Sequence, residues 1–257
     1  MNTLTAMLLL IINSAYQKDA NYYIALTLIQ ERHQLESLSI TALARLCQTS
    51  VSSVNKFCKM LGAQSFSDLK YNLNKGFIVR KEQMAFRLSK MNEEEMLSNI
   101  AYHAQQAFDK AAFKTSVEHL VEIIKSSPSV QLIGAYFPTS LAINFQEDMI
   151  TMDKLVYVQP QKRIIEADPL SNQDLILLIT LTGRLYEYAK NDFDRLCQTH
   201  RHIALISGFA DYPKYPAIEG LVKMPIVEDN EIGNILILET FRYIKYMYFH
   251  KYVKELS

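Results

Sequence analysis

This sequence of 257 residues has few cysteines and no long apolar run. Its three cysteines, Cys47, Cys58 and Cys197, are widely spaced, which argues against both a disulfide framework and a zinc site. We therefore expect three small buried thiols, with no metal and no cofactor, in a chain suited to a reducing cytoplasm.

The longest early apolar run covers residues 6–12, which is too short to cross a bilayer. No lysine or arginine precedes this run, so it also makes a poor signal peptide. The expectation is a cytoplasmic protein without a membrane segment, in which residues 6–12 form the buried stripe of a first helix.

A net charge is also lacking, because the chain holds 27 basic and 27 acidic residues. The balance hides an asymmetry. Residues 1–90 hold 11 basic and 5 acidic residues, a net of +6, whereas residues 91–257 hold 16 and 22, a net of −6. A basic first part joined to an acidic remainder indicates that only the first part meets a polyanion, although a solvated basic face gives the same count.

Two kinds of hydrophobic spacing divide the chain. Up to about residue 125, apolar residues recur at helical spacing. After Pro128, short apolar runs of the kind expected for strands alternate with helical patterns, which indicates an α/β layer with a mainly parallel sheet. The expected strands are residues 130–134, 155–158, 174–179, 202–206 and 220–224, and the expected helices among them and after them are residues 140–151, 185–198 and 235–253.

Residues 39–62 have the spacing of a helix-turn-helix. Ser39 opens the first short helix, and Gly62 is a plausible C-cap of the second. Val54 and Phe57 of the second helix face inward, which leaves short polar and basic side chains outward, as a helix entering a DNA major groove needs. The predicted DNA-binding residues, with Lys70 as a further backbone contact, are Ser50, Ser52, Ser53, Asn55, Lys56, Lys59 and Lys70.

These side chains have distinct expected roles. Serines near the helix start can bond phosphate or base edges, and Asn55 can read an adenine. Lys56 and Lys59 can offset phosphate charge. From spacing alone, the alternative is an ordinary helical hairpin whose polar face is simply solvated.

The first 80 or so residues resemble the RpiR/MurR family of bacterial transcription regulators. In that family an arginine usually precedes the F-C-K-x-L-G core, and here Lys56 takes its place, which loses the bidentate fork toward guanine. Ser53 stands where the family has threonine. The resemblance rests on Ser39-Ile40, Ala44, Val54, Lys56-Phe57-Cys58-Lys59, Leu61-Gly62, Ser65-Phe66 and Leu69-Lys70.

The resemblance implies that the second half is a sugar isomerase (SIS) domain, a flavodoxin-like α/β layer that senses phosphosugars. Residues 174–183 look like its second strand and phosphate loop. Hydroxyls and backbone N–H groups would converge there at a helix N-terminus, where the dipole favours an anion. The ligand-binding residues that the resemblance implies are Ser140, Thr180, Thr182, Gly183 and Arg184.

Three residues depart from the SIS pattern. Tyr136 and Pro138 stand where the family has glycine and serine, and Leu185 stands where it has threonine. A tyrosine narrows a phosphate loop, and proline removes an amide donor. The alternative is therefore a domain with a degenerate pocket that only dimerises.

The sequence thus predicts an α + α/β protein in three parts. Residues 1–78 form an all-helical helix-turn-helix domain, residues 79–92 a helical linker, and residues 93–257 a flavodoxin-like SIS domain with a mainly parallel sheet and flanking helices. The leading hypothesis is a transcription regulator without enzyme activity, a homodimer or tetramer on a palindromic double-stranded DNA operator. It would control genes of sugar metabolism or uptake in response to a sugar phosphate.

Two alternatives belong to other classes. One is a phosphosugar isomerase on the SIS fold, for which the only local acid–base candidates are Glu147, Asp148 and Glu187. The other is a binding module that keeps the fold but has lost its affinity for DNA.

Overall fold

The computed structural model describes residues 3–15, 17–104, 108–160, 173–183, 186, 189–199, 202–209, 211–227 and 229–254, with the backbone alone at 136–138 and 160. The chain divides into two compact units, Met1–Met84 and Ala85–Ser257, and each is described by itself. Within these described ranges, no helix combines the length and the apolar character that a membrane span requires.

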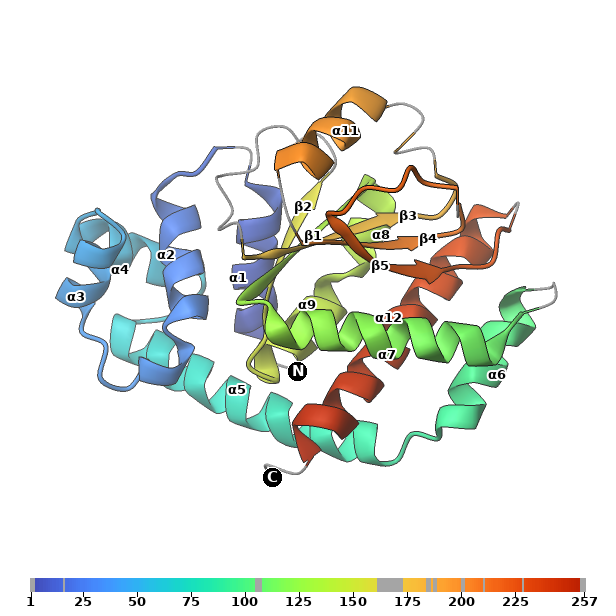
Figure 1. Ribbon diagram of the computed structural model, residues 1–257. Helices are drawn as coiled ribbons and strands as arrows, with labels where there is room; N and C mark the ends of the chain where they lie inside the picture. Colours follow the sequence, from blue (N-terminus) through green and yellow to red (C-terminus); the bar gives the residue numbers. More distant parts are fainter. Residues whose placement is uncertain are drawn as a thin grey trace. The chain divides into compact units, whose positions relative to one another are not determined.

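The first unit is helical throughout its described residues (Figure 1). Its core is built from buried aliphatic and aromatic side chains such as Leu8, Leu28, Leu43 and Phe57. The elements are α1 (Thr3–Ser14), α2 (Ala20–Gln30), the 3₁₀ turn η1 (Arg32–Gln34), α3 (Ile40–Leu46), α4 (Val51–Met60) and α5 (Phe66–Ser89), which continues past the unit boundary.

The second unit alternates helices and strands. Its described elements are α6 (Glu93–Ala104), α7 (Lys110–Ser126), β1 (Ser129–Gly134), α8 (Tyr136–Leu141), α9 (Ile143–Thr151), β2 (Leu155–Pro160), β3 (Leu175–Thr180), α11 (Lys190–Thr199), β4 (Ile203–Ser207), β5 (Ile218–Lys223) and α12 (Asn230–Tyr252). Each of the five apolar runs in the sequence therefore lies on a strand, and the expected strands are confirmed.

The sheet is parallel in every pairing, in the order β2-β1-β3-β4-β5. This is the flavodoxin-like order, so the predicted fold class is confirmed. Every residue of β1, β3 and β4 is buried. Burial on both faces explains why these strands appear in the sequence as continuous apolar runs rather than as alternating patterns.

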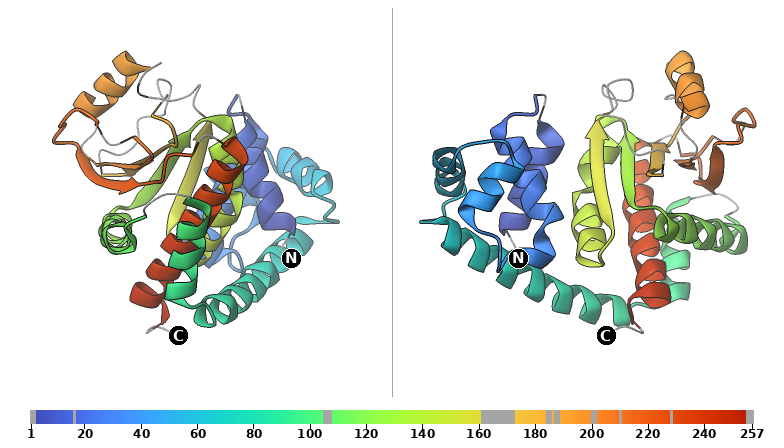
Figure 2. Two further views of the ribbon diagram at one scale, coloured as in Figure 1. Left: turned by 90° about the vertical axis from the view of Figure 1, so that its right-hand side faces the viewer. Right: turned by 60° about the vertical axis from the view of Figure 1, so that its left-hand side comes forward.

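Helices cover both faces of the sheet. Figures 1 and 2 show α11 on one face and α7, α9 and α12 on the other. On the α11 side, Phe193 and Leu196 pack on Ile176 and Leu205 of the two central strands. The result is a three-layer unit whose strands end at one edge, where ligands of open parallel sheets bind.

Three predicted helix starts were wrong. The expected helix 185–198 corresponds to α11, which begins at Lys190. The expected helix 140–151 is two helices, α8 and α9, and it begins four residues early because Pro138 lies in the first turn of α8, where no amide donor is needed. The last helix begins at Asn230 rather than at residue 235. Its N-cap is Asp229, whose carboxylate accepts from the amide of Glu231 at 2.7 Å.

Candidate DNA-binding surface and ligand site

The turn between α3 and α4 is a tight helix end. The amide of Thr49 donates to the carbonyl of Ala44 at 2.9 Å, and that of Gln48 donates to Arg45 at 3.1 Å. This is the Schellman pattern, in which the residue after the C-cap takes the left-handed conformation. Gln48 does so here, with φ +51°. The turn that the sequence placed at residues 48–50 is thereby fixed.

Polar caps fix both ends of α4. The hydroxyl of Ser50 accepts from the amide of Ser53 at 3.1 Å, which satisfies one of the open donors of the first turn. At the other end Gly62 adopts φ +81°, and the amide of Ala63 donates to the carbonyl of Cys58 at 2.9 Å. The helix therefore ends at the glycine that the sequence indicated.

A small core holds α3 and α4 against α2. Val54 and Phe57 are buried, as predicted from their spacing. The thiol of Cys47, at the end of α3, lies 3.3 Å from the hydroxyl of Thr27 on α2. Burial raises the pKa of Cys47 and of Cys58, so both remain protonated thiols at neutral pH and serve packing rather than chemistry.

The outward face of α4 carries most of the predicted DNA contacts. Ser52, Asn55, Lys56 and Lys59 are all exposed on this one helix. Ser50 is exposed at its start, and Ser53 is half-buried with its hydroxyl 3.0 Å from that of Ser50. The structure therefore brings these six predicted residues together on α4 and its N-cap.

The segment that contains α3 and α4 carries charge of one sign. The sequence from residue 37 to residue 67 contains no aspartate or glutamate, and it contains three basic residues. Two of them are Lys56 and Lys59, and the third is Arg45, which is exposed on α3. Arg45 was missed at the sequence level, although its place directly before the turn could have suggested it. An excess of positive charge of this kind attracts a polyanion.

Lys70 has a different position. Its ammonium donates to the carbonyls of Glu36 at 3.1 Å and Leu38 at 2.8 Å, and it lies over the Phe66 ring at 5.4 Å. It thus ties α5 to the segment before α3. Its predicted contact with DNA would have to replace these internal bonds.

The candidate ligand site lies where β1 and β3 end. These neighbours are the point at which the strand order reverses, because β2 lies on one side of β1 and β4 on the far side of β3. Gly134 pairs with Ile179, and a Cβ on Gly134 would lie 2.8 Å from the Ile179 carbonyl oxygen. Glycine is therefore required for the close approach of the two strand ends.

The turn after β3 contains three of the predicted ligand residues. Thr180 is buried at the strand end, Thr182 is exposed, and Gly183 adopts φ +74°. A Cβ on Gly183 would lie 2.6 Å from that of Phe209. Both the positive φ and this close contact therefore exclude a residue with a side chain at position 183. The amide of Gly208 donates to the Leu181 carbonyl at 2.9 Å, which fixes the turn to the loop after β4.

The remaining predicted ligand residues are less closely placed. Ser140 is exposed on α8, the helix that directly follows β1. Arg184 and Leu185 lie outside the described residues. The structure therefore brings Thr180, Thr182 and Gly183 together in one turn, with Ser140 on the helix after the adjacent strand.

An aromatic cluster beside this turn was missed at the sequence level. The hydroxyls of Tyr212 and Ser207 are 2.8 Å apart, and burial raises the pKa of Tyr212. The Tyr215 hydroxyl donates to Asp194 at 2.7 Å, and this bond raises the pKa of Tyr215 to about 12. The sequence pattern that could have indicated this cluster is the recurrence of an aromatic residue at every third position, at Phe209, Tyr212 and Tyr215. The cluster consists of Tyr186, Phe193, Phe209, Tyr212 and Tyr215.

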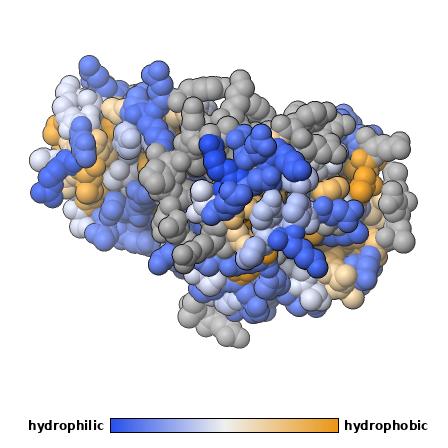
Figure 3. All heavy atoms as spheres, turned by 45° about the horizontal axis from the view of Figure 1, so that its top comes forward, coloured by the Kyte–Doolittle hydropathy of each residue, from blue (hydrophilic) through white to orange (hydrophobic). Residues whose placement is uncertain are grey.

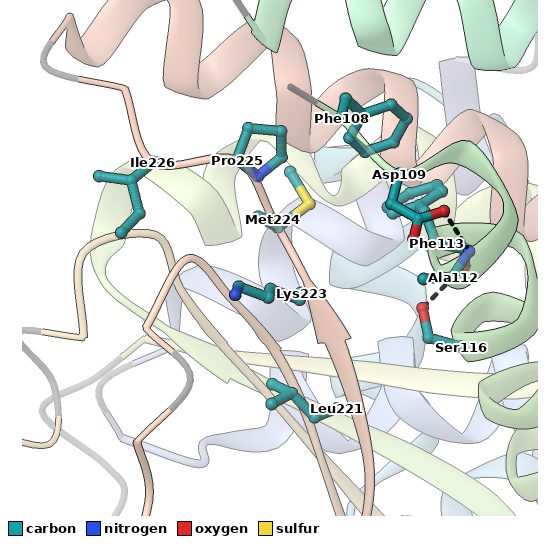
Figure 4. A pocket seen from close by; sticks show the side chains of 10 residues that line it. All are labelled: Phe108, Asp109, Ala112, Phe113, Ser116, Leu221, Lys223, Met224, Pro225 and Ile226. Atoms are coloured by element: carbon teal, nitrogen blue, oxygen red, sulfur yellow. Dashed lines mark hydrogen bonds between the residues drawn. The ribbon is translucent and has the colours of Figure 1, made fainter. Parts of the chain in front are cut away.

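A separate groove of about 490 Å³ lies between the start of α7 and the end of β5. Figure 4 shows Phe108, Asp109 and Ser116 on one wall, and Leu221, Lys223 and Ile226 on the other. The Asp109 carboxylate caps α7 by accepting from the amide of Ala112 at 2.9 Å. Of the described residues that line this groove, none is Ser140, Thr180, Thr182 or Gly183. On the face of the molecule in Figure 3, apolar residues form small patches among hydrophilic ones.

The acid–base candidates of the isomerase alternative occupy structural positions. Asp148 is fully buried, and its Oδ2 accepts from Arg87 at 2.7 Å and from Lys245 at 2.8 Å. Glu147 is also buried, and Glu187 lies outside the described residues. Asp148 therefore serves as a buried anchor for two cations, which is a structural role.

Comparison with protein families finds a match in the first unit. Residues 6–78 match the model of a helix-turn-helix domain of the rpiR family. The match covers α1 to α4 and the first half of α5. None of the curated proteins compared with the chain matches it.

Solved structures of similar outline include two whose descriptions name phosphosugars. The Vibrio vulnificus NanR protein complexed with ManNAc-6P is 15% identical, with a TM-score of 0.45, over 98% of this chain and 93% of that one. A Methanococcus jannaschii protein, for which a function as 3-hexulose-6-phosphate isomerase was inferred, is 11% identical, with a TM-score of 0.43, over 63% and 91%. At these values the likeness carries no inference, and the flavodoxin-like fold rests on the strand order.

Proposed function

We propose that this protein is a DNA-binding transcription regulator of the RpiR/MurR type. The observation that carries the proposal is the outward face of α4, which presents Asn55, Lys56 and Lys59 within a helix-turn-helix domain. No carboxylate of the surrounding segment, residues 37–67, opposes the phosphate backbone. In this class of domain the second helix enters the major groove, where side chains near its start contact base edges.

The roles follow from side-chain chemistry. Asn55 has the donor and acceptor pair that reads adenine, and Ser52 can bond either a base edge or a phosphate. Lys56 and Lys59 supply charge without the planar fork of arginine. The proposal therefore assigns sequence selectivity chiefly to Asn55 and affinity chiefly to the lysines.

Fluorescence anisotropy with labelled DNA from upstream of the protein's own gene tests this assignment. We expect Asn55→Ala to reduce the preference for that DNA over random duplex, by about 1–3 kcal/mol for one bidentate contact. Lys56→Ala should weaken binding to both DNAs. Lys81→Ala is the matched control, because Lys81 is an exposed lysine on α5, away from α4. Unchanged binding by Asn55→Ala and Lys56→Ala would show that α4 is not the recognition helix.

We further propose that the second unit senses a phosphorylated sugar at the turn after β3. The support is local. Thr180, Thr182 and Gly183 lie in one turn at the switch point of the sheet, a usual binding place in such folds. The aromatic cluster lies beside this turn, with Phe209 against Gly183. Control of sugar-related genes would follow if the ligand bound one arrangement of the dimer better.

Thermal unfolding with a panel of sugar phosphates tests the ligand proposal. A ligand at one hundred times its Kd stabilises the folded state by about 2.7 kcal/mol, which is a measurable shift in Tm. Thr182→Val keeps the side-chain shape and removes the hydroxyl, so it should reduce this shift. Ser116→Ala, in the groove beside α7, is the control and should leave the shift unchanged. The reverse pattern would place the ligand in that groove.

A regulator is preferred to an isomerase because of Asp148. This carboxylate is one of the three acid–base candidates that the sequence offers, and it is ion-paired to two cations. A helix-turn-helix domain also has a direct use in a regulator and none in sugar isomerisation. Incubation of an aldose phosphate with the protein should therefore yield no ketose.

A further inference from the structure

One face of α5 carries large apolar side chains in solvent. The exposed fractions of Tyr71, Ile78 and Phe86 are 66%, 54% and 63%. Lys90 lies over the Phe86 ring at 3.9 Å and still leaves most of it open. Between these apolar residues lie two exposed charges, Lys75 and Glu82. Steps of three and four residues keep all five on one helix face, which we call the α5 stripe.

The α5 stripe lies opposite the side of the helix that packs within the chain. Leu69, Leu73, Met84 and Leu88 are buried, and their positions along the helix fall on the other face. In contrast, none of residues 74–83 is buried, although Phe77, Ile78 and Val79 are consecutive apolar residues. Exposed apolar surface of this kind on a helix marks a site of association.

We propose that the α5 stripe binds the same stripe of a second copy of this chain, with the two helices antiparallel. The stripe is symmetric about the bond between Ile78 and Val79. Tyr71 lies as many residues before that bond as Phe86 lies after it, and Lys75 and Glu82 are related in the same way. A two-fold axis through this point therefore places Tyr71 against Phe86 of the second copy, and Ile78 beside the axis.

The charges select this arrangement. In the antiparallel pair, each Lys75 meets Glu82 of the other copy, so two ion pairs flank the central apolar contact. In a parallel pair, Lys75 would face Lys75 and Glu82 would face Glu82, which is repulsive. The stripe is therefore complementary to itself in one orientation only. Such an isologous contact closes at two copies and exposes no further stripe.

The consequence for function rests on the proposed DNA binding. The stripe begins in the turn of α5 that follows the helix-turn-helix, so its pairing joins two DNA-binding units by a two-fold axis. Two-fold symmetry in the protein is what a palindromic operator requires. The contact between the copies itself does not depend on DNA, and its test needs none.

Disulfide cross-linking of the full-length protein tests the pairing and its register. The native cysteines are buried, so the unmodified chain serves as the uncross-linked control. Ile78→Cys lies beside the axis and should form a disulfide dimer readily. Tyr71→Cys alone should not, because the two copies of that position lie roughly 20 Å apart at 1.5 Å per residue. A co-expressed mixture of Tyr71→Cys and Phe86→Cys should cross-link between the two variants.

Three outcomes would overturn the proposal. Cross-linking of Tyr71→Cys with itself as readily as Ile78→Cys would mean a parallel or non-specific contact. A dimeric mass without cross-linking at Ile78→Cys would place the dimer contact elsewhere. A monomeric mass at micromolar concentration would leave the stripe to a different partner.

Charge exchange gives a second, independent test by analytical ultracentrifugation. Lys75→Glu or Glu82→Lys alone turns the two exposed ion pairs of the dimer into repulsions and should weaken dimerisation about tenfold. The double variant Lys75→Glu/Glu82→Lys should restore the wild-type dissociation constant. Lys81→Glu lies off the stripe and should change it little. A double variant as weak as the single ones would contradict the pairing of Lys75 with Glu82.

Discussion

Asp148 shows how one buried carboxylate can organise a unit of the protein. It is fully buried on α9, and its Oδ2 accepts from Lys245 of α12 and from Arg87 near the end of α5. Lys245 is also buried, and it donates to Asn144 at 2.7 Å. Three helices are therefore fixed through a single oxygen atom of a side chain that is itself inaccessible to water.

We predict that Asp148→Asn destabilises the second unit by about 3–5 kcal/mol, because it leaves Lys245 as a buried cation without its carboxylate. Arg87→Ala should reduce the free energy of unfolding clearly less, since 41% of the Arg87 side chain is exposed and Asp148 keeps its bond to Lys245. Urea denaturation followed by circular dichroism measures both. If both variants lost the same free energy of unfolding, the buried pair of Asp148 with Lys245 would not be the stronger contributor.

The sequence could not predict contacts of this kind, which join residues that are far apart along the chain. Asp148 was an acid–base candidate because its neighbours in the sequence place it near the first strand. Its partners, Arg87 and Lys245, are 61 and 97 residues away. Lys70 is similar, since the carbonyls of Glu36 and Leu38 that it binds belong to a segment more than 30 residues earlier. Only the fold brings such groups together.

At the scale of elements, the ends of α3 and α4 are built alike from different residues. Both end in a Schellman turn, with Gln48 at φ +51° after α3 and Gly62 at φ +81° after α4. Glycine adopts this conformation without strain, whereas a residue with a Cβ does not. The helix-turn-helix therefore contains one relaxed and one strained helix end.

We predict opposite effects of substitution at these two positions. Gln48→Gly should stabilise the first unit by about 0.5 kcal/mol, since relief of about 1–2 kcal/mol of strain is offset by the entropy of glycine, about 0.5–1 kcal/mol. Gly62→Ala should destabilise it by about 1–2 kcal/mol, and a Cβ there meets no neighbour within 4 Å, so the effect is purely conformational. Differential scanning calorimetry measures both, and a loss for Gln48→Gly would contradict the account.

The strands and the helix-turn-helix were predictable for physical reasons. Strands buried on both faces appear as continuous apolar runs, and residues 130–134 and 174–179 are of that kind. Helix starts were less predictable, because Pro138 within a first turn looks like a break and Asp229 was not recognised as a cap. The aromatic cluster was missed because the loop that carries Phe209, Tyr212 and Tyr215 meets Tyr186 and Phe193 only in the fold.

At the scale of the whole molecule, the chain joins a basic helical unit to an α/β unit whose strands end in a candidate anion site. Its parallel sheet agrees with the change of hydrophobic spacing after Pro128, but that change does not mark the division of the chain at Met84. The central claim is that the first unit reads DNA through α4. The claim does not depend on which ligand, if any, the second unit senses.

Selection of duplexes from a random pool by the full-length protein, followed by binding measurements over a range of salt concentrations, tests this claim most directly. The account predicts enrichment of a palindrome with half-sites about 10 base pairs apart or a multiple of that. Affinity should fall steeply with salt, and Lys59→Ala should make the slope of log K against log salt shallower by about 1. A pool without enrichment, bound as tightly by Lys59→Ala and with the same salt dependence, would contradict it.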